Sequence, residues 1–147
     1  MNLKDLYINF FVSKEIRTMV VTKIVSPISS IVKLREILVD LQRKIAEGHD
    51  VIMEGRDITT VVFPNANYKF YLDADVTERA RRRFEENKTK GIESTFEEIL
   101  ENIKKRDYND MHKEVGSLTR TEDSIYIDST NMTIDEVVEK IKNIIEV

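Results

Sequence analysis

The chain reads VIMEGRDITTVVFP from Val51 to Pro64. Its apolar run, Val51 to Met53, breaks at Gly55-Arg56-Asp57 and resumes at Ile58, which predicts a buried strand that ends in a charged turn. A guanidinium and a carboxylate are costly to remove from water unless each is paired or held for a ligand. Because neighbouring side chains on a strand face opposite ways, we favour separate, ligand-facing roles for Arg56 and Asp57 over a mutual ion pair that locks the turn.

Helical and extended patterns alternate on either side of this stretch. A helix is predicted from Lys33 to Ala46, with an apolar face toward the core made of Leu34, Ile37, Leu38, Leu41 and Ile45. Further helices are predicted at about 76–88, from Phe96 onward and at 134–145, and short strands at 51–54, 68–72 and 124–127. This alternation indicates an α/β fold with a mainly parallel sheet, whose ligands usually lie at the carboxyl ends of the strands. Those predicted ends carry Arg56, Asp57, Asp73 and Asp128.

Capping signals support two of these helices. Asp75 with Glu78 opens the helix at 76–88, and Thr133 with Glu136 opens the last helix, which we expect to bury its apolar face of Val137, Val138, Ile141 and Ile144. The first 30 residues are less clear, because Leu6 to Val12 is compatible with a strand and Ser13 to Ile24 has helical spacing that Pro27 ends.

Composition narrows the function classes. At 147 residues the chain is long enough for one compact domain, and its net charge of −4 argues against bulk attraction to nucleic acid or to a membrane surface. There is no cysteine, so disulfides and thiolate metal sites are excluded, and two well-separated histidines, His49 and His112, do not predict a metal site. The sequence offers neither a signal-peptide pattern nor an 18-residue apolar span, so we expect a cytoplasmic location.

The printed sequence has no glycine-rich phosphate loop. Its four glycines, Gly48, Gly55, Gly91 and Gly116, fit neither G-x-x-x-x-G-K-[ST] nor G-x-G-x-x-G. Any bound anion must therefore be held in another way.

Two clusters of charge are candidates for that role. Arg79, Arg81, Arg82 and Arg83 crowd the start of a predicted helix, where the helix dipole disfavours cations, so we favour a phosphate clamp over a solvated face balanced by nearby glutamates. The apolar stripe of the helix from Phe96 leads into Arg106, Asp110 and Lys113. If that helix persists, these charges point toward the core or a cleft; if it ends near Asp107, they form a solvated ion-pair run worth little energy.

Other polar residues are less informative on spacing alone. Arg35 is expected at the surface, Ser26 in a turn beside Pro27, and Asp73 and Asp128 in helix-capping or loop-turn roles.

The motifs taken together resemble bacterial cytidylate kinase from about Leu6 to the C-terminus. The resemblance rests on Ile16-Arg17-Thr18, Ser26, Arg35-Glu36, Gly55-Arg56-Asp57-Ile58-x-Thr60-Val61-Val62-Phe63-Pro64, the arginines from Arg79 to Arg83, Arg106-Asp107-x-x-Asp110 and Asp128-Ser129-Thr130. That family transfers the terminal phosphoryl group of ATP to CMP or dCMP, with magnesium accompanying ATP. The resemblance implies a three-layer P-loop nucleoside-monophosphate-kinase fold that is incomplete here, because the first strand and the P-loop are not among these 147 residues.

The resemblance also implies roles for individual residues. Contacts to CMP are expected from Arg17, Ser26, Arg35, Arg56, Asp57, Asp110 and Lys113, the last standing where the family has an arginine. ATP phosphates are expected at Arg79, Arg82 and Arg83, and catalytic roles at Arg82, Arg83 and Asp57. Residues 1–32 would then be a remnant of the monophosphate-binding subdomain, and residues 33–147 a core α/β domain with an arginine-rich lid at about 79–92.

Departures from the family pattern leave three functions open. Without a P-loop the ATP phosphates lack a backbone cradle, so intrinsic kinase activity is doubtful and a non-catalytic CMP-binding remnant is an alternative. A third reading is a protein-interaction domain. In the family, the P-loop strand lies between the strands at 51–54 and 68–72, so we expect a gap there of roughly 10 Å, with exposed strand edges that invite homo-oligomers through the open sheet.

Overall fold

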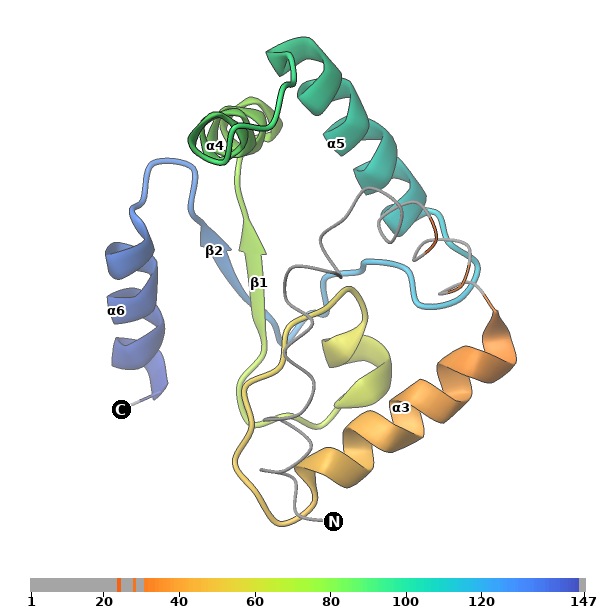
Figure 1. Cartoon of the computed structure of the whole chain (residues 1–147). Coiled ribbons are helices and arrows are strands. Elements are labelled where there is room, and N and C mark those ends of the chain that lie inside the picture. Colours follow the sequence, from red (N-terminus) through yellow and green to blue (C-terminus); the bar gives the residue numbers. More distant parts are fainter. Residues whose placement is uncertain (1–23, 25–27, 29–30, 146–147) are drawn as a thin grey trace.

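The computed structural model describes residues 24, 28 and 31–145 (Figure 1). In chain order the elements are α3 (Val32–Ala46), the π-helix η2 (Ile58–Val62), β1 (Phe70–Asp73), α4 (Val76–Thr89), α5 (Phe96–Met111), β2 (Ile125–Asp128) and α6 (Ile134–Ile145). This is a mixed α/β arrangement. The helices predicted at 33–46, at about 76–88, from Phe96 onward and at 134–145 are present as α3, α4, α5 and α6. The patterns at Leu6 to Val12 and Ser13 to Ile24 lie outside the described residues, except for Ile24 itself. Within the described residues, no helix is both long and apolar enough to cross a membrane.

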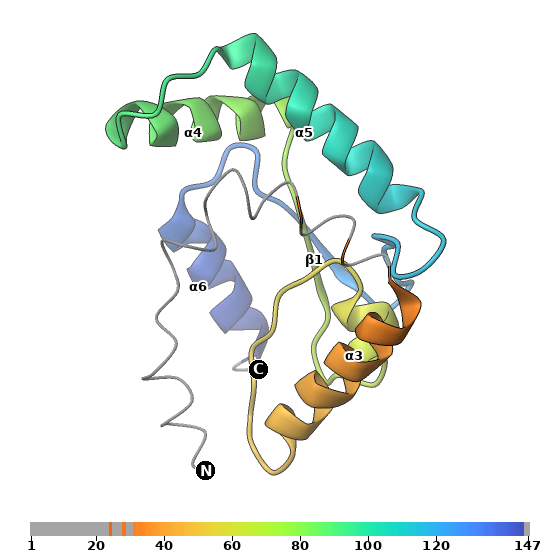
Figure 2. The same cartoon turned by 45° about the vertical axis from the view of Figure 1, so that its right-hand side comes forward.

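The sheet is small and parallel. β1 pairs with β2 in a register that sets Phe70 opposite Ile125 and Asp73 opposite Asp128. The predicted strands at 68–72 and 124–127 are therefore confirmed, with shifted bounds. In two views α6 lies on one side of the sheet and α3 with η2 on the other (Figures 1 and 2). Ile127 in β2 is completely buried.

The third predicted strand, at 51–54, is wrong. Residues 51–54 belong to no strand, and none of their backbone groups forms a hydrogen bond with another described residue. A strand needs a hydrogen-bonded neighbour, and fully exposed Ile52 has no apolar surface to pack against. The apolar residues after Asp57 form η2 instead of extended chain.

α4 and α5 pack against each other. Thr95 opens α5 with a capping box, in which its hydroxyl accepts from the Glu98 N–H and the Glu98 carboxylate accepts from the Thr95 N–H. The two helices are joined by an ion pair of 2.8 Å between Arg79 Nη2 and Asp107 Oδ2. Because α5 continues to Met111, the alternative that it ends near Asp107 is wrong.

Burial on α3 and α6 differs from the sequence prediction. The side of α3 that meets η2 contains buried Val39, whereas Ile37, Leu38 and Leu41 are about half exposed. The predicted core face is therefore turned away from the described part of the core. On α6 the predicted capping box of Thr133 and Glu136 is present, but no α6 residue is fully buried.

The start of α4 is stabilised by two carboxylates. Asp75 accepts hydrogen bonds from the backbone N–H groups of Thr77 and Glu78, which confirms its predicted cap. Glu78 does not complete the pair; its side chain accepts from Arg81 and Arg82, each at 2.8 Å. Those two hydrogen bonds lower the pKa of Glu78 from 4.5 to about 2.

This shift predicts a pH-dependent contribution of Glu78 to stability. A carboxyl whose pKa is lower in the folded state contributes stability that is fully present above its unfolded pKa and is lost as the pH falls toward the folded value. We expect the stability difference between the wild type and Glu78→Gln, measured by urea unfolding, to be largest above about pH 4.5 and to shrink toward pH 2. Glu85→Gln on the same helix is the control, and a Glu78→Gln difference that does not vary with pH would contradict the assignment.

Candidate functional site

A bend at Gly55-Arg56-Asp57 leads directly into η2. A Cβ on Gly55 would lie 2.8 Å from the Ile58 side chain, so a larger residue here would force that side chain to shift. The backbone oxygen of Asp57 accepts from the N–H of Val61 at 2.8 Å and is part of the η2 hydrogen-bond pattern. Asp57 is 6% exposed, so its carboxylate is fixed in a buried position.

Asp57 pairs with Arg35, not with its neighbour Arg56. Arg35 extends from α3 and forms an ion pair with the Asp57 carboxylate. Its guanidinium lies against Gly116, where a Cβ would overlap it and where φ is +69°. Both the space and the backbone conformation therefore call for glycine at position 116. The expectation that Arg35 is a surface charge is wrong, since its side chain is 19% exposed.

Arg56 joins a second cluster around Asp110 on α5. Arg56 Nε lies 3.0 Å from Asp110 Oδ2, Lys113 Nζ lies 2.9 Å from Oδ1, and Arg106 Nε lies 3.6 Å from Oδ2. Asp110 is 5% exposed and the Lys113 side chain 21%, so these two face inward, as predicted for a helix that persists. The Arg106 side chain is 68% exposed, so the same prediction is wrong for Arg106. Arg56 and Asp57 thus have separate partners, which agrees with the prediction that they do not pair with each other.

The two clusters carry an excess of positive charge and unused bonding capacity. Four cations face two carboxylates, a net local charge of +2. Arg35 Nε, Asp57 Oδ2 and Asp110 Oδ2 are buried and form no hydrogen bond with the described residues, although both oxygens lie in ion pairs. Of these three atoms, Arg35 Nε is the one outside an ion pair, and a buried donor without a partner costs about 1–3 kcal/mol unless a ligand or water meets it. A pocket beside Arg35 and Asp57 is completed by Leu38, Val39 and Gln42.

The arginines of α4 have two kinds of partner. Arg79 donates to the Ala74 carbonyl at 3.0 Å and pairs with Asp107, one turn before Asp110 on α5. Arg82 donates to the carbonyls of Ser129 at 2.6 Å and Thr130 at 3.1 Å in the loop after β2. Arg81 and Arg83 pair with Glu78 and Glu86 on their own helix. Ion pairs with glutamates are therefore present, and a role of the cluster in phosphate binding stays a prediction.

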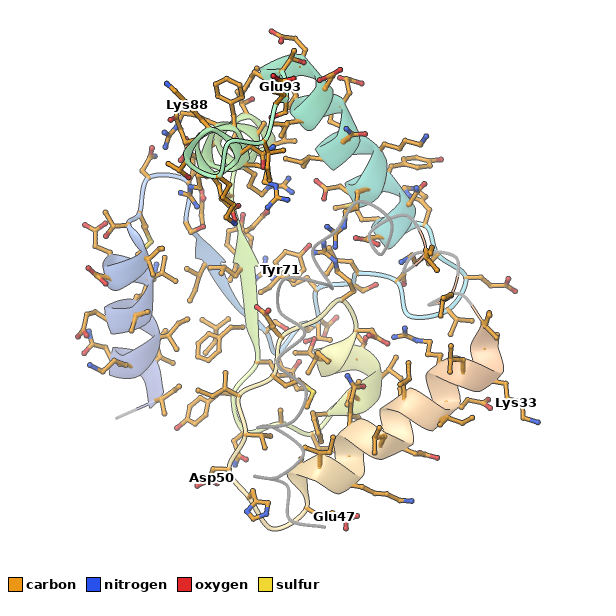
Figure 3. All side chains as sticks on the ribbon, viewed as in Figure 1. Lys33, Glu47, Asp50, Tyr71, Lys88 and Glu93 are labelled. Carbon is orange, nitrogen blue, oxygen red and sulfur yellow. The ribbon has the colours of Figure 1, made fainter. Side chains whose placement is uncertain are left out.

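The carboxylates at the strand ends hold loops, as predicted. Asp73 accepts from the Ala74 N–H at 2.8 Å, and Asp128 accepts from the Thr130 N–H at 2.9 Å. The Tyr126 hydroxyl donates to Asp73 at 3.1 Å, which raises the pKa of Tyr126. Tyr71, stacked with Tyr126, points to the side of the sheet opposite α6 (Figure 3).

Some predictions cannot be placed in this geometry. Arg17 and Ser26 lie outside the described residues. Among residues 24, 28 and 31–145, no group of three or more His, Cys, Asp or Glu side chains could hold a metal ion, so we assign no magnesium ligand and derive no step through that ion.

Two residues that hold the site were not assigned by the sequence analysis. Arg43 on α3 donates from Nη2 to the Val61 carbonyl at 2.6 Å and from Nε to the Val62 carbonyl at 3.0 Å. Gly116 provides the space for Arg35. The unusual scarcity of glycine in the chain could have drawn attention to Gly116, whereas no local pattern singles out Arg43.

Comparison with known proteins gives a consistent family. A family model described as cytidylate kinase matches residues 3–147. A cytidylate kinase of Caldanaerobacter subterraneus subsp. tengcongensis is 54% identical over 130 residues, which are 88% of this chain and 58% of that protein. Cytidylate kinases of Lactobacillus johnsonii and Alkaliphilus oremlandii are each 48% identical over 135 residues, 92% of this chain and 59% and 62% of those proteins.

This chain therefore spans about 60% of the length of the curated relatives that it matches. The match nevertheless covers nearly all of its own residues, from the segment before α3 to the end of α6. On these grounds the chain belongs to the cytidylate kinase family.

Proposed function

We propose that this chain binds CMP or dCMP, as the monophosphate-binding part of a cytidylate kinase with an incomplete three-layer P-loop kinase fold. The observation that carries the proposal is the pair of buried carboxylates, Asp57 and Asp110, surrounded by Arg35, Arg56, Arg106 and Lys113. All of these residues except Arg106 are ones to which the family resemblance assigns contacts with CMP.

The excess of positive charge suits the phosphate of a nucleoside monophosphate. A phosphate monoester carries a charge of about −1.5 to −2 at pH 7, which the net local charge of +2 would neutralise. Arginine forks bind phosphate oxygens through two parallel hydrogen bonds, and Arg35 Nε still has a free N–H among the described contacts. Lys113 contributes charge without that fork, because its ammonium acts as a point charge.

The buried carboxylates suit the cytosine base. A carboxylate accepts hydrogen bonds from the exocyclic amino group of cytosine, a group that uracil replaces with a carbonyl oxygen. Asp57 Oδ2 and Asp110 Oδ2 are buried oxygens with remaining acceptor capacity. Either can therefore favour CMP over UMP, because a carbonyl facing a carboxylate leaves two acceptors without a donor.

Phosphoryl transfer from ATP is the family activity, and we assign its charge stabilisation to Arg82 and Arg83, with Arg79 nearby. Positioning and charge neutralisation account for most of the catalysis in this reaction. In the described contacts Arg82 is held by backbone carbonyls and Glu78, and Arg83 by Glu86. ATP phosphates would have to replace the glutamates, and magnesium would come with ATP.

The first test of this proposal is calorimetric titration with nucleotides. We expect saturable binding of CMP, weaker binding of UMP, and a loss of CMP affinity of about tenfold or more in Arg56→Ala, since a hydrogen bond between charged groups is removed. Lys104→Ala, which removes an exposed cation of α5 paired only with Glu101, should bind CMP as the wild type does. No heat with CMP from folded protein would exclude the proposal.

The second test is turnover. The sequence contains no glycine-rich loop for the ATP β- and γ-phosphates, and losing even one preorganised donor costs about 100-fold or more in rate. We therefore expect a coupled assay of the purified 147-residue chain with ATP, magnesium and CMP to read near background. Robust turnover that Arg82→Ala abolishes would show that donor phosphates are held without such a loop.

A protein-interaction role is the second candidate, and the outer edge of β1 favours it. The carbonyls of Lys69 and Asp73 accept from β2, so the backbone groups of Phe70 and Leu72 point the other way. In the described part of the chain no strand pairs with that edge, and Leu72 is 57% exposed. Identical edges can pair around a two-fold axis, so we take a second copy of the chain as the partner.

Sedimentation velocity over a concentration series tests this second candidate. We expect a monomer–dimer equilibrium that shifts toward monomer in Leu72→Lys, because a lysine on the edge disfavours pairing between copies. The control is Lys140→Ala, which changes an exposed residue of α6 away from the β1 edge. A protein that is monomeric at all concentrations would exclude the proposed dimer. That result would leave the proposal of CMP binding unchanged.

A further inference from the structure

Two arginines of α3 hold opposite ends of η2. Arg35 pairs with the side chain of Asp57, the residue that precedes η2, and Arg43 donates to the carbonyls of Val61 and Val62 at its other end. The two arginines are eight residues apart, which is about 12 Å along a helix. Buried Val39 lies between them in the sequence. α3 therefore holds both ends of the π-helix.

The end of η2 depends on an external donor. The last backbone hydrogen bond of this turn runs from the Phe63 N–H to the Ile58 carbonyl at 2.7 Å, and the final carbonyls of any helix lack donors within it. Val62 is almost completely buried. The Arg43 fork serves two adjacent carbonyls at once, which a lysine ammonium at one point cannot do in the same geometry.

η2 in turn fixes the bend that carries the site. The Asp57 carbonyl accepts from the N–H groups of Val61 at 2.8 Å and Val62 at 3.3 Å, and the Thr60 hydroxyl donates to it at 3.3 Å. Val61 and Val62 thus connect Arg43, through their carbonyls, to Asp57, through their N–H groups. Loosening the carbonyl end would loosen the hydrogen bonds that orient Asp57 and the preceding Arg56.

We propose that Arg43 is a positioning residue for the CMP site and acts on Asp57 and Arg56 through η2. This inference rests on the proposed function for its ligand. Arg43 has no contact with the Asp57 or Asp110 carboxylates among the described interactions, so its effect is on the fraction of molecules with a competent bend. Apparent affinity falls in proportion to that fraction.

Calorimetric titration of CMP into Arg43→Met and Arg43→Lys tests this proposal, at a temperature where every variant is folded by circular dichroism. We expect Arg43→Met to raise the Kd for CMP by about tenfold and Arg43→Lys, which can reach one carbonyl, to give an intermediate value. A Kd for Arg43→Met equal to that of the wild type would overturn the proposal.

Two control variants separate positioning from general stability. Ile127→Val shortens a completely buried side chain in β2, so it should lower the melting temperature and leave the Kd for CMP unchanged. Lys44→Met removes the neighbouring cation of α3 and should leave the melting temperature and the Kd for CMP unchanged. If Ile127→Val raises the Kd as much as Arg43→Met does, the role of Arg43 is only structural.

Amide hydrogen exchange measured without nucleotide tests the effect of Arg43 on η2 independently of the proposed function, because no ligand is involved. We expect faster exchange at Val61, Val62 and Phe63 in Arg43→Met than in the wild type or Lys44→Met, because the hydrogen bonds of η2 open more often. Unchanged exchange at these three amides would overturn the proposed action of Arg43 on η2. If the wild type fails to bind CMP while the amides of Arg43→Met still exchange faster, the proposed function is overturned. The stabilisation of η2 by Arg43 is then retained.

Discussion

The described structure depends on neutralising two buried carboxylates, Asp57 and Asp110. A buried ion left without its partner costs about 3–5 kcal/mol, so each carboxylate pairs with at least one cation distant in sequence, and Asp110 also pairs with a nearby lysine. Arg35 comes from α3, Arg56 from the bend before η2, and Lys113 from just beyond α5. The position of α3 against η2, and of that bend against α5, is therefore fixed by charge as well as by apolar contact.

Because these ion pairs join elements distant in sequence, the parts of the fold that were predictable are those set by local contacts. Helices α3 to α6 follow from local spacing and from caps such as Asp75 and Thr133, each of which accepts from an N–H three residues away. The strand predicted at 51–54 failed because strand formation depends on a neighbour supplied by tertiary structure, which local apolar character does not reveal. Likewise, apolar spacing shows that α3 is amphipathic, but long-range contacts decide that the face with Arg35, Val39 and Arg43 meets η2.

The candidate site shows the same division. Arg56 and Asp57 do not pair with each other, as predicted. The predicted reason, the alternation of side chains along a strand, does not apply, because both residues lie in a bend. The observed place of the Arg35 guanidinium is against Gly116, which is far away in the chain and whose φ of +69° favours glycine. Arg43 gave no signal because its partners are backbone carbonyls, whose chemistry is the same at every residue. The family resemblance identified Arg35 as a site residue, whereas Gly116 and Arg43 were identified only from the structure.

A site held together by ion pairs has a consequence for how it would take a nucleotide. Arg56 and Lys113 already share the Asp110 carboxylate, and only Nε of the Arg56 guanidinium is engaged there. A phosphate can therefore either add to their remaining N–H groups or exchange partners with that carboxylate. The exchange is balanced if the displaced carboxylate gains a donor, and the amino group of cytosine is such a donor. If the proposed CMP binding follows this exchange, phosphate and base recognition are coupled through Asp110: inorganic phosphate alone would leave a buried carboxylate with fewer partners, whereas CMP would offer a partner to each charge. This coupling would make the site selective for the whole nucleotide over its separate parts.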